Sequence, residues 1–235
     1  MHNDNGRTFL MFSFKRSPLL IRKINTNKAE IYLTFDDGPD AQCTPAVLDL
    51  LREEGALGTF FVIGDRARKY PALVERMIHE GHSVFSHSID HHYRHYFRSR
   101  AGLKTWLTES LRDLEAQTKS QQKVFRPPAG VLTPPLMSLS QELGIPLILW
   151  THRFYDSTRP WIESAAHKSA LKIRPGDIVL LHDSQKSRNC PIFLKTLRFY
   201  LQDVKKRGFL FSILTLSLIE TEVLHAQNAA HADSP

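Results

Sequence analysis

Ile31-Tyr-Leu-Thr-Phe-Asp-Asp-Gly-Pro39 has the pattern of a buried strand that ends at two carboxylates. Its apolar residues alternate with Tyr and Thr, all of them good strand formers, and Gly-Pro then interrupts the pattern. Adjacent strand residues point to opposite faces, so Asp36 and Asp37 share one cavity only if the chain turns there. Glycine permits such a turn, and proline fixes the direction in which the chain leaves it.

An aspartate at the end of a strand often does no more than cap the next helix. Here the next helix has its own start several residues later, with Thr44 as its cap and Pro45 in its first turn. Asp36 and Asp37 are therefore not needed as caps. We expect them to have a chemical role.

The composition indicates one domain with tails. The chain has 235 residues, of which 31 are basic and 24 acidic, for a formal net charge of +7. The basic residues are mostly scattered, and no basic patch is interleaved with aromatic residues, so we expect no nucleic-acid partner. Cys43 and Cys190 are isolated and far apart, which suggests neither a disulfide framework nor a cysteine metal site. We expect a separate structural or exposed role for each cysteine.

The hydropathy pattern shows no run long enough for a transmembrane helix. The apolar segment Phe9–Phe14 is too short for the core of a signal peptide and lacks a small-residue cleavage site. We therefore expect a cytoplasmic protein, with action at the cell envelope left open. Packing of this basic, apolar segment across the domain is favoured over contact with a membrane surface. The pattern does not indicate an oligomeric state.

Seven expected strands alternate with helices along the chain. The strands are expected at 31–35, 59–62, 82–86, 124–125, 146–150, 177–181 and 209–214, and helices at 44–54, 71–80, 102–117, 135–143, 161–172 and 191–206. No hairpin signal intervenes, so this alternation predicts a parallel sheet. Its length and rhythm fit a barrel related to the eightfold (β/α) type but one unit short.

Polar side chains follow five of these strands, at the end where such barrels gather their chemistry. They are Asp36, Asp37, His87, His91, Arg126, Asp156 and His182. This coincidence indicates a functional site more strongly than any single motif does.

His87 and His91 are four residues apart, which places both imidazoles on one face of a helical turn. Together with one carboxylate from the first strand, they would fill three positions of a divalent cation and leave a fourth open. The alternative is an ordinary surface cluster in a chain with 12 histidines. His92 could replace His91 if the turn is irregular.

Four motifs occur in this order: Thr34-Phe-Asp-Asp-Gly-Pro39, His87-Ser-Ile-Asp-His91, Arg126-Pro-Pro-Ala-Gly130 and Leu180-Leu-His182. Together they resemble the polysaccharide deacetylases of carbohydrate esterase family 4, the NodB-like domain. The resemblance covers about residues 31–214, between an N-terminal extension (1–30) and a C-terminal tail (215–235). It implies an α/β fold, a distorted (β/α)7 barrel, in which a divalent metal supports hydrolysis of N-acetyl or O-acetyl groups on sugars. The implied metal is Zn²⁺, with Co²⁺ or Ni²⁺ as alternatives.

The resemblance also implies the roles of the residues at the metal. Asp37, His87 and His91 would hold the cation, and Asp36 would be the general base. Arg126 would orient Asp36 and favour its ionised form, which is the form that can accept a proton from water.

The remaining implied roles concern the acid and the substrate. His182 would be the general acid, because an imidazolium can protonate the leaving amine, and Asp156 would pair with it. Leu180 would help to form the pocket for the acetyl methyl group. Independently of the resemblance, backbone N–H groups near Pro39 or Ala129 are candidates to bind the oxyanion of the substrate.

Three positions depart from the family pattern. Ala129 stands where tyrosine is common, Ser157 stands where many members have tryptophan, and Arg153 stands where an acid is frequent. We therefore expect an intact metal centre and an altered substrate surface.

We interpret the chain as a metal-dependent hydrolase that deacetylates an amino-sugar polysaccharide or glycoconjugate, such as peptidoglycan or a chitin-like oligomer. The alternatives are a deformylase or amidase acting on a small or lipid-linked sugar, and a catalytically silent carbohydrate-binding protein. The presence of Asp36 and His182 argues against the silent alternative. Adjacent Asp36 and Asp37 also fit a metal better than glycoside hydrolysis, which needs two carboxylates placed across a sugar ring.

Overall fold

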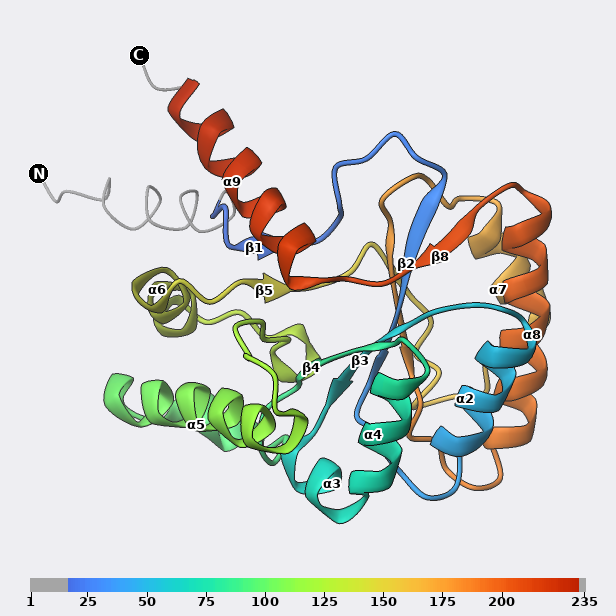
Figure 1. The fold of residues 1–235 in the computed structure, drawn as a ribbon, viewed down its shortest axis with the longest axis horizontal. Coiled ribbons are helices and arrows are strands. Elements are labelled where there is room, and N and C mark those ends of the chain that lie inside the picture. Colours follow the sequence, from blue (N-terminus) through green and yellow to red (C-terminus); the bar gives the residue numbers. More distant parts are fainter. Residues whose placement is uncertain (1–16, 233–235) are drawn as a thin grey trace, which may run out of the picture.

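A computed structural model describes residues 17–232 of the chain, and Figure 1 shows its strands surrounded by helices. We expect the segment Phe9–Phe14 to pack across the domain. It lies outside the described residues. Within the described part, no helix combines the length and apolar character needed to cross a membrane.

The strands are short, and the ladders between them are all parallel. They are β1 (Leu20–Ile21), β2 (Glu30–Asp36), β3 (Thr59–Val62), β4 (Ser83–Ser86), β5 (Leu147–Ile148), β6 (His152–Arg153), β7 (Ile178–His182) and β8 (Leu210–Ser212).

The helices lie between and after these strands. They are α2 (Thr44–Glu53), α3 (Gly64–Lys69), α4 (Pro71–His79), α5 (Arg100–Thr118), α6 (Pro134–Leu143), α7 (Glu163–Ala170), α8 (Cys190–Lys206) and α9 (Leu216–Ala232), with the 3₁₀ turns η1 (Tyr93–Phe97) and η2 (Pro128–Gly130).

Strand β2 is the centre of the sheet. The ladder runs β4-β3-β2-β7-β6, and β8 pairs with the first residues of β2. Strands β1 and β5 form a separate ladder, which isolated bridges at Phe125 connect to β4. The predicted distorted (β/α)7 barrel is therefore confirmed, although its wall is not closed. The expected strand 124–125 is reduced to these bridges.

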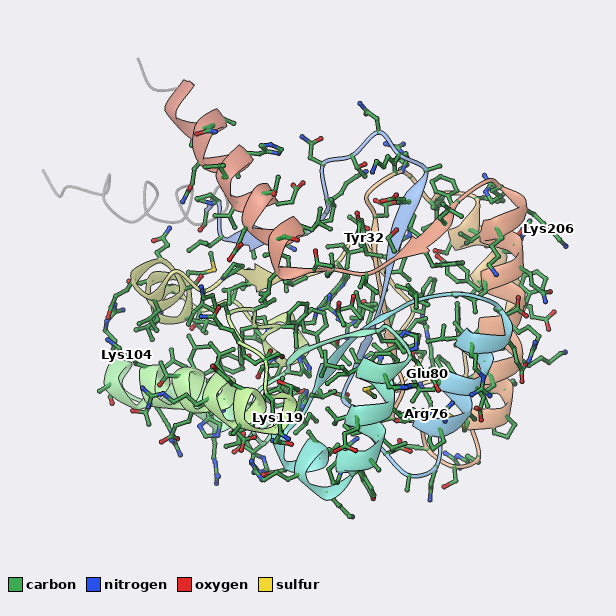
Figure 2. The ribbon with its side chains drawn as sticks, viewed as in Figure 1. Tyr32, Arg76, Glu80, Lys104, Lys119 and Lys206 are labelled. Atoms are coloured by element: carbon green, nitrogen blue, oxygen red, sulfur yellow. A yellow bond between two sulfur atoms is a disulfide. The ribbon has the colours of Figure 1, made fainter. Side chains whose placement is uncertain are left out.

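Both faces of β2 are buried, which explains its apolar sequence. Ile31, Leu33 and Phe35 join the large core that also includes residues of α2 and α8. Tyr32 points to the other face, where it packs with Ile178 of β7. We call the buried apolar residues of this group the inner cluster: Ile21, Ile24, Tyr32, Phe61, Phe85, Val124, Ile148, Ile178, Leu214 and Ile219. Charged side chains lie on the outer helices, where Arg76 and Glu80 of the α4 segment form an ion pair at 2.7 Å (Figure 2).

Segments near the two ends of the described chain also contribute to the core. Ile21 of β1 and Ile24 join the inner cluster, and so does Ile219 of α9. The inner cluster therefore draws on residues on both sides of the range 31–214.

The start of α2 differs from the expectation that Thr44 caps it. The N-cap residue is Cys43, and Thr44 is the first helical residue. The Thr44 hydroxyl instead donates a hydrogen bond to Asp183 Oδ2 at 2.6 Å. Thr44 therefore links the segment after β2 to the segment after β7.

Cys43 and Cys190 form a disulfide with an S–S distance of 2.08 Å, so the expectation of separate roles is wrong. The two cysteines are 147 residues apart in the sequence. They meet because β2 and β7 are hydrogen-bonded neighbours, which places the segments after both strands at the same edge of the sheet. Cys43 precedes α2, and Cys190 begins α8.

We predict that replacing both cysteines by alanine lowers the free energy of unfolding by about 2–5 kcal/mol, because the bond restricts a long loop in the unfolded chain. Urea unfolding of the wild type and the double variant, with and without reductant, measures the effect. Reductant should destabilise the wild type and leave the double variant unchanged. Equal stability of both proteins under oxidising conditions would contradict the prediction.

Candidate metal centre and active site

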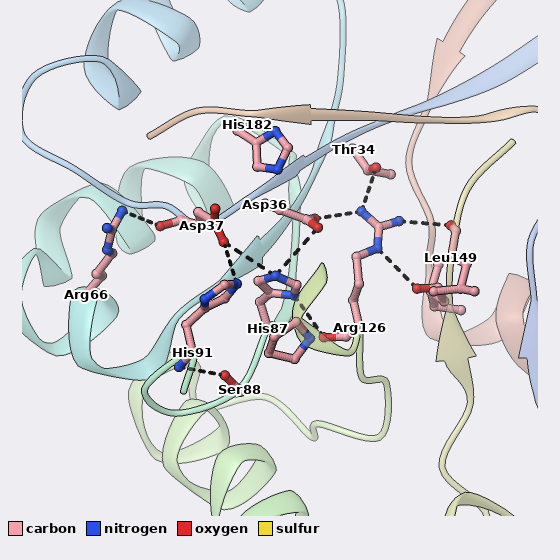
Figure 3. Close-up of polar contacts among 12 residues, drawn as sticks. Thr34, Asp36, Asp37, Arg66, His87, Ser88, His91, Arg126, Leu149 and His182 are labelled. Carbon is pink, nitrogen blue, oxygen red and sulfur yellow. Dashed lines mark hydrogen bonds and ion pairs between the residues drawn. The ribbon is translucent and has the colours of Figure 1, made fainter. Parts of the chain in front are cut away.

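Three potential metal ligands converge beyond the ends of β2 and β4. One ligand atom each of Asp37, His87 and His91 lies within 4.8 Å of the other two. Asp37 Oδ1 is 3.5 Å from His87 Nε2 and 3.2 Å from His91 Nε2. Figure 3 shows the Asp37 carboxylate facing both imidazoles. The same Oδ1 is buried and has no hydrogen-bond partner. A divalent cation bound by one carboxylate and two imidazoles fits this donor set and would satisfy that oxygen.

A left-handed residue brings the Asp37 carboxylate to the same side as Asp36. Asp37 has a φ of 71°, so the chain leaves the extended conformation directly after β2. A side chain at Gly38 would collide with the Asp183 carboxylate, so only glycine fits this close approach. The turn predicted at the end of the strand is therefore present.

The ring of His87 is oriented by the backbone of Arg126. His87 Nδ1 is 2.8 Å from the Arg126 carbonyl oxygen, which can only accept, so Nδ1–H donates a hydrogen bond to it and Nε2 is the nitrogen that faces Asp37. Burial lowers the pKa of His87 to about 3, against an opposing effect of Asp37. The imidazole is therefore neutral at physiological pH, which is the form that binds metals.

His91 reaches the site from a loop, so the expectation of a helical turn is wrong. Ser88 and His91 have φ values of 74° and 56°, and the His91 N–H donates to Ser88 Oγ at 3.0 Å. Of the two candidates, His91 and not His92 belongs to the converging group. The irregular backbone determines which of the two histidines faces Asp37, and residue spacing alone does not reveal this.

Asp36 is held by Arg126 at the inner end of the site. Arg126 Nη1 donates to Asp36 Oδ1 and to Thr34 Oγ1, both at 2.7 Å, and the guanidinium is fully buried. The other oxygen, Asp36 Oδ2, lies 3.7 Å from His87 Nε2. Asp36 therefore has one oxygen fixed by a cation and one facing the candidate metal position.

His182 lies on the strand next to Asp36. The two residues are direct partners in the β2–β7 register, and Figure 3 shows His182 beside both aspartates. His182 Nδ1 is 3.0 Å from Asp156 Oδ1, and Asp156 Oδ2 accepts bonds from the His182 N–H and from Gln185 Nε2.

These contacts set the charge of His182. Burial lowers its pKa, but the hydrogen bond to Asp156 and the charges of Asp156, Asp36 and Asp37 outweigh burial and raise the pKa to about 9. The imidazolium is therefore the main form at neutral pH, and it can donate a proton.

The expected substrate residues lie at different depths. Leu180 is buried on β7, two residues before His182 and therefore on the same face of the strand. Pro39 is buried after the turn, and Ala129 is exposed in η2 with a φ of 54°. Leu180 pairs in register with Arg153 of β6.

Several contributors to the site were not anticipated. Thr34 and Arg66 flank the two aspartates: Arg66 Nη1 donates to the Asp37 carbonyl oxygen at 2.6 Å and also to Ser184 Oγ. Burial raises the pKa of Asp183 to about 7, partly offset by the Thr44 hydroxyl. The position of Thr34 within the first motif was a usable signal, whereas nothing local to Arg66 indicated its contact.

The chain is similar to known polysaccharide deacetylases in sequence and in fold. Residues 23–148 match the model of the family described as polysaccharide deacetylase. The chain is 34% identical to a peptidoglycan-N-acetylglucosamine deacetylase of Bacillus cereus, over 80% of this chain and 88% of that protein. It is 31% identical to a chitooligosaccharide deacetylase of Azorhizobium caulinodans, over 80% and 93%. A solved peptidoglycan N-acetylglucosamine deacetylase superposes with a TM-score of 0.76 at 25% identity, over 86% and 94%.

We predict that His87→Ala abolishes stoichiometric binding of a divalent cation, because it removes a buried, oriented ligand. Asp36→Asn should retain the cation, since Asp36 is outside the converging group. Elemental analysis after dialysis against trace metal measures both, and circular dichroism controls for folding. Full metal content in folded His87→Ala would show that the triad is not the metal site.

Proposed function

The chain belongs to the polysaccharide deacetylase family, and we propose that it is a metal-dependent hydrolase that removes N-acetyl or O-acetyl groups from an amino-sugar polysaccharide or glycoconjugate. The observation that carries this proposal is the convergence of Asp37, His87 and His91 beside the Asp36–His182 pair. The peptidoglycan and chitooligosaccharide deacetylases among the relatives support the substrate class.

We propose Zn²⁺ as the cation, held by Asp37, His87 and His91, because two imidazoles and one carboxylate are a common set for catalytic zinc. Co²⁺ and Ni²⁺ accept similar nitrogen and oxygen ligands. When bound, the cation would polarise the acyl carbonyl and lower the pKa of water at the site.

Asp36 is the proposed general base. Its Oδ1 is engaged by Arg126, so Oδ2 is the atom available to take a proton from the attacking water. Because Arg126 is itself fixed by four bonds, Asp36 needs no reorientation during the reaction.

His182 is the proposed general acid. Its Nδ1 is occupied by Asp156, which leaves Nε2 to deliver a proton to the departing amine. Asp156 thus positions the ring and stabilises its charged form. Leu180, on the same face of β7 as His182, is the proposed contact for the acyl methyl group.

The Cys43–Cys190 disulfide supports action in an oxidising compartment, since such bonds persist mainly outside the reducing cytoplasm. The names of the peptidoglycan-acting relatives agree with a cell-envelope substrate. We therefore propose the cell envelope as the place of action, in preference to the cytoplasm.

We predict that the metal-loaded protein releases acetate from acetylated amino-sugar oligomers, and that Asp36→Asn lowers kcat about 10²–10⁴-fold through loss of the base. A panel of peptidoglycan fragments, chitooligosaccharides and formylated sugars, assayed for acetate and formate, tests the activity. Release of formate alone would favour a deformylase. Near-native rates in Asp36→Asn would refute the base assignment.

We predict that kcat/KM falls as pH rises through about 9, because the raised pKa of His182 keeps the acid protonated below that pH. Asp156→Asn removes the negative charge that favours the imidazolium, so the alkaline limb should move to lower pH. The pH profiles of both proteins, at constant metal loading, provide the measurement. An alkaline limb at the same pH in folded Asp156→Asn would argue against His182 as the acid.

A further inference from the structure

Arg153 lies at the mouth of the barrel on the face that carries the catalytic residues. In the β6–β7 ladder it pairs with Leu180, and in-register neighbours of a parallel pair share a face. His152, the residue before Arg153, points to the opposite face of the sheet, because its ring contacts Ser169 of the outer helix α7. Arg153 is therefore on the same side of the sheet as Leu180 and His182.

Aromatic rings hold the Arg153 guanidinium in place. Its Cζ lies 4.3 Å from the ring centroid of Tyr155 and 5.6 Å from that of Trp150. Trp150 in turn packs against Gly130 and lies 5.9 Å from Arg126 Cζ, so the stack starts beside the residue that orients Asp36. We call Trp150, Arg153 and Tyr155 the rim cluster.

The cation of the rim cluster has no carboxylate partner. Among residues 17–232, neither Arg153 nor Arg159, which also stacks on Tyr155, has an acidic group within ion-pair distance. The carboxylate next along the chain, Asp156, is buried, and its two oxygens are used by His182 and Gln185. Arginines on the outer helices, such as Arg76 and Arg198, are paired with glutamates.

A guanidinium stacked through its faces keeps its N–H groups free at the edges, in a planar fork that matches a carboxylate. Arg153 is exposed, so an incoming ligand can reach these edges. The ring contacts also reduce the conformational freedom that the side chain would lose on binding. The cluster therefore has the properties of a preformed anion site.

We propose that the rim cluster is a subsite for an amino sugar that carries a carboxylate near its acylated nitrogen, with Arg153 binding that carboxylate. This inference rests on the proposed function, because it assigns the acyl group of the same sugar to the site at Leu180 and His182. It narrows the substrate class from acetylated amino sugars in general to acidic ones, such as sugars with a lactyl ether.

The first test uses the unmodified protein and three oligosaccharides of equal length. One contains N-acetylmuramic acid with free carboxylates, the second is its methyl ester, and the third is a neutral N-acetylglucosamine oligomer. We expect KM to be at least about tenfold lower for the free acid than for its ester, with the difference shrinking at high salt. Equal KM values for acid and ester would overturn the proposal.

The second test uses Arg153→Gln, with Arg112→Gln as a matched control because Arg112 is an exposed arginine of α5. Arg153→Gln should raise KM about tenfold for the free acid and leave kcat, and both constants for the neutral oligomer, within about twofold. Arg153→Lys should give an intermediate KM, since it keeps the charge and loses the fork. Parallel losses on acidic and neutral sugars would show a merely structural role.

A binding measurement distinguishes failure of this inference from failure of the proposed function. Calorimetry with the de-N-acetylated acidic disaccharide measures the subsite without any turnover. Weaker binding by Arg153→Gln than by wild type and Arg112→Gln supports the subsite, even if no sugar releases acetate and the proposed function fails. Unchanged affinity in Arg153→Gln overturns the subsite, even if deacetylation is observed.

Discussion

The buried ion pair between Arg126 and Asp36 is the interaction on which the site depends. A fully buried guanidinium is tolerated only when its donors are satisfied, and here Asp36, Thr34 and the carbonyl oxygens of Ile148 and Leu149 accept from it. Its planar face lies 3.8 Å from the ring centroid of Phe61. Arg126 therefore joins β2 to the end of β5, two strands that are not neighbours in the sheet. Its own carbonyl oxygen also orients His87.

This pairing explains how two adjacent acids acquire different tasks. The charge of Asp36 is balanced by Arg126 inside the protein, so Asp36 requires no further cation. Asp37, turned by its left-handed backbone, has a buried Oδ1 without a hydrogen-bond partner and faces two imidazole nitrogens. Arg126 thus balances the charge of Asp36, and the Asp37 carboxylate suits an external cation.

The sequence predicted the features that follow from strand patterning. The buried β2, its abrupt end at two acids and the polar residues after later strands all depend on local alternation and on the rule that parallel strands end at one edge. Features that depend on backbone irregularity were predicted less well. The spacing of His87 and His91 predicts a helical turn, whereas left-handed Ser88 and His91 form a loop.

Long-range pairing was the other source of error. The Cys43–Cys190 disulfide requires knowing that β2 neighbours β7, and strand order is not encoded in residue spacing. Without the strand order, the sequence does not indicate the hydrogen bond from Thr44 to Asp183 and predicts only a local cap at Thr44. Arg66 was missed for a related reason, because its partners Asp37 and Ser184 come from two different loops.

The division between strand-borne and loop-borne residues also explains where this chain departs from its family. Asp36, Leu180 and His182 stand on the paired strands β2 and β7, so the sheet fixes their positions. The exposed Ala129 provides no aromatic wall, and Ser157 does not replace it. The small Gly130 instead lets Trp150 pack close to η2, and Trp150 carries the stacked Arg153 and Tyr155. The segment from Trp150 to Tyr155 therefore presents two aromatic rings and a positive charge, apart from the strand-borne Asp36 and His182.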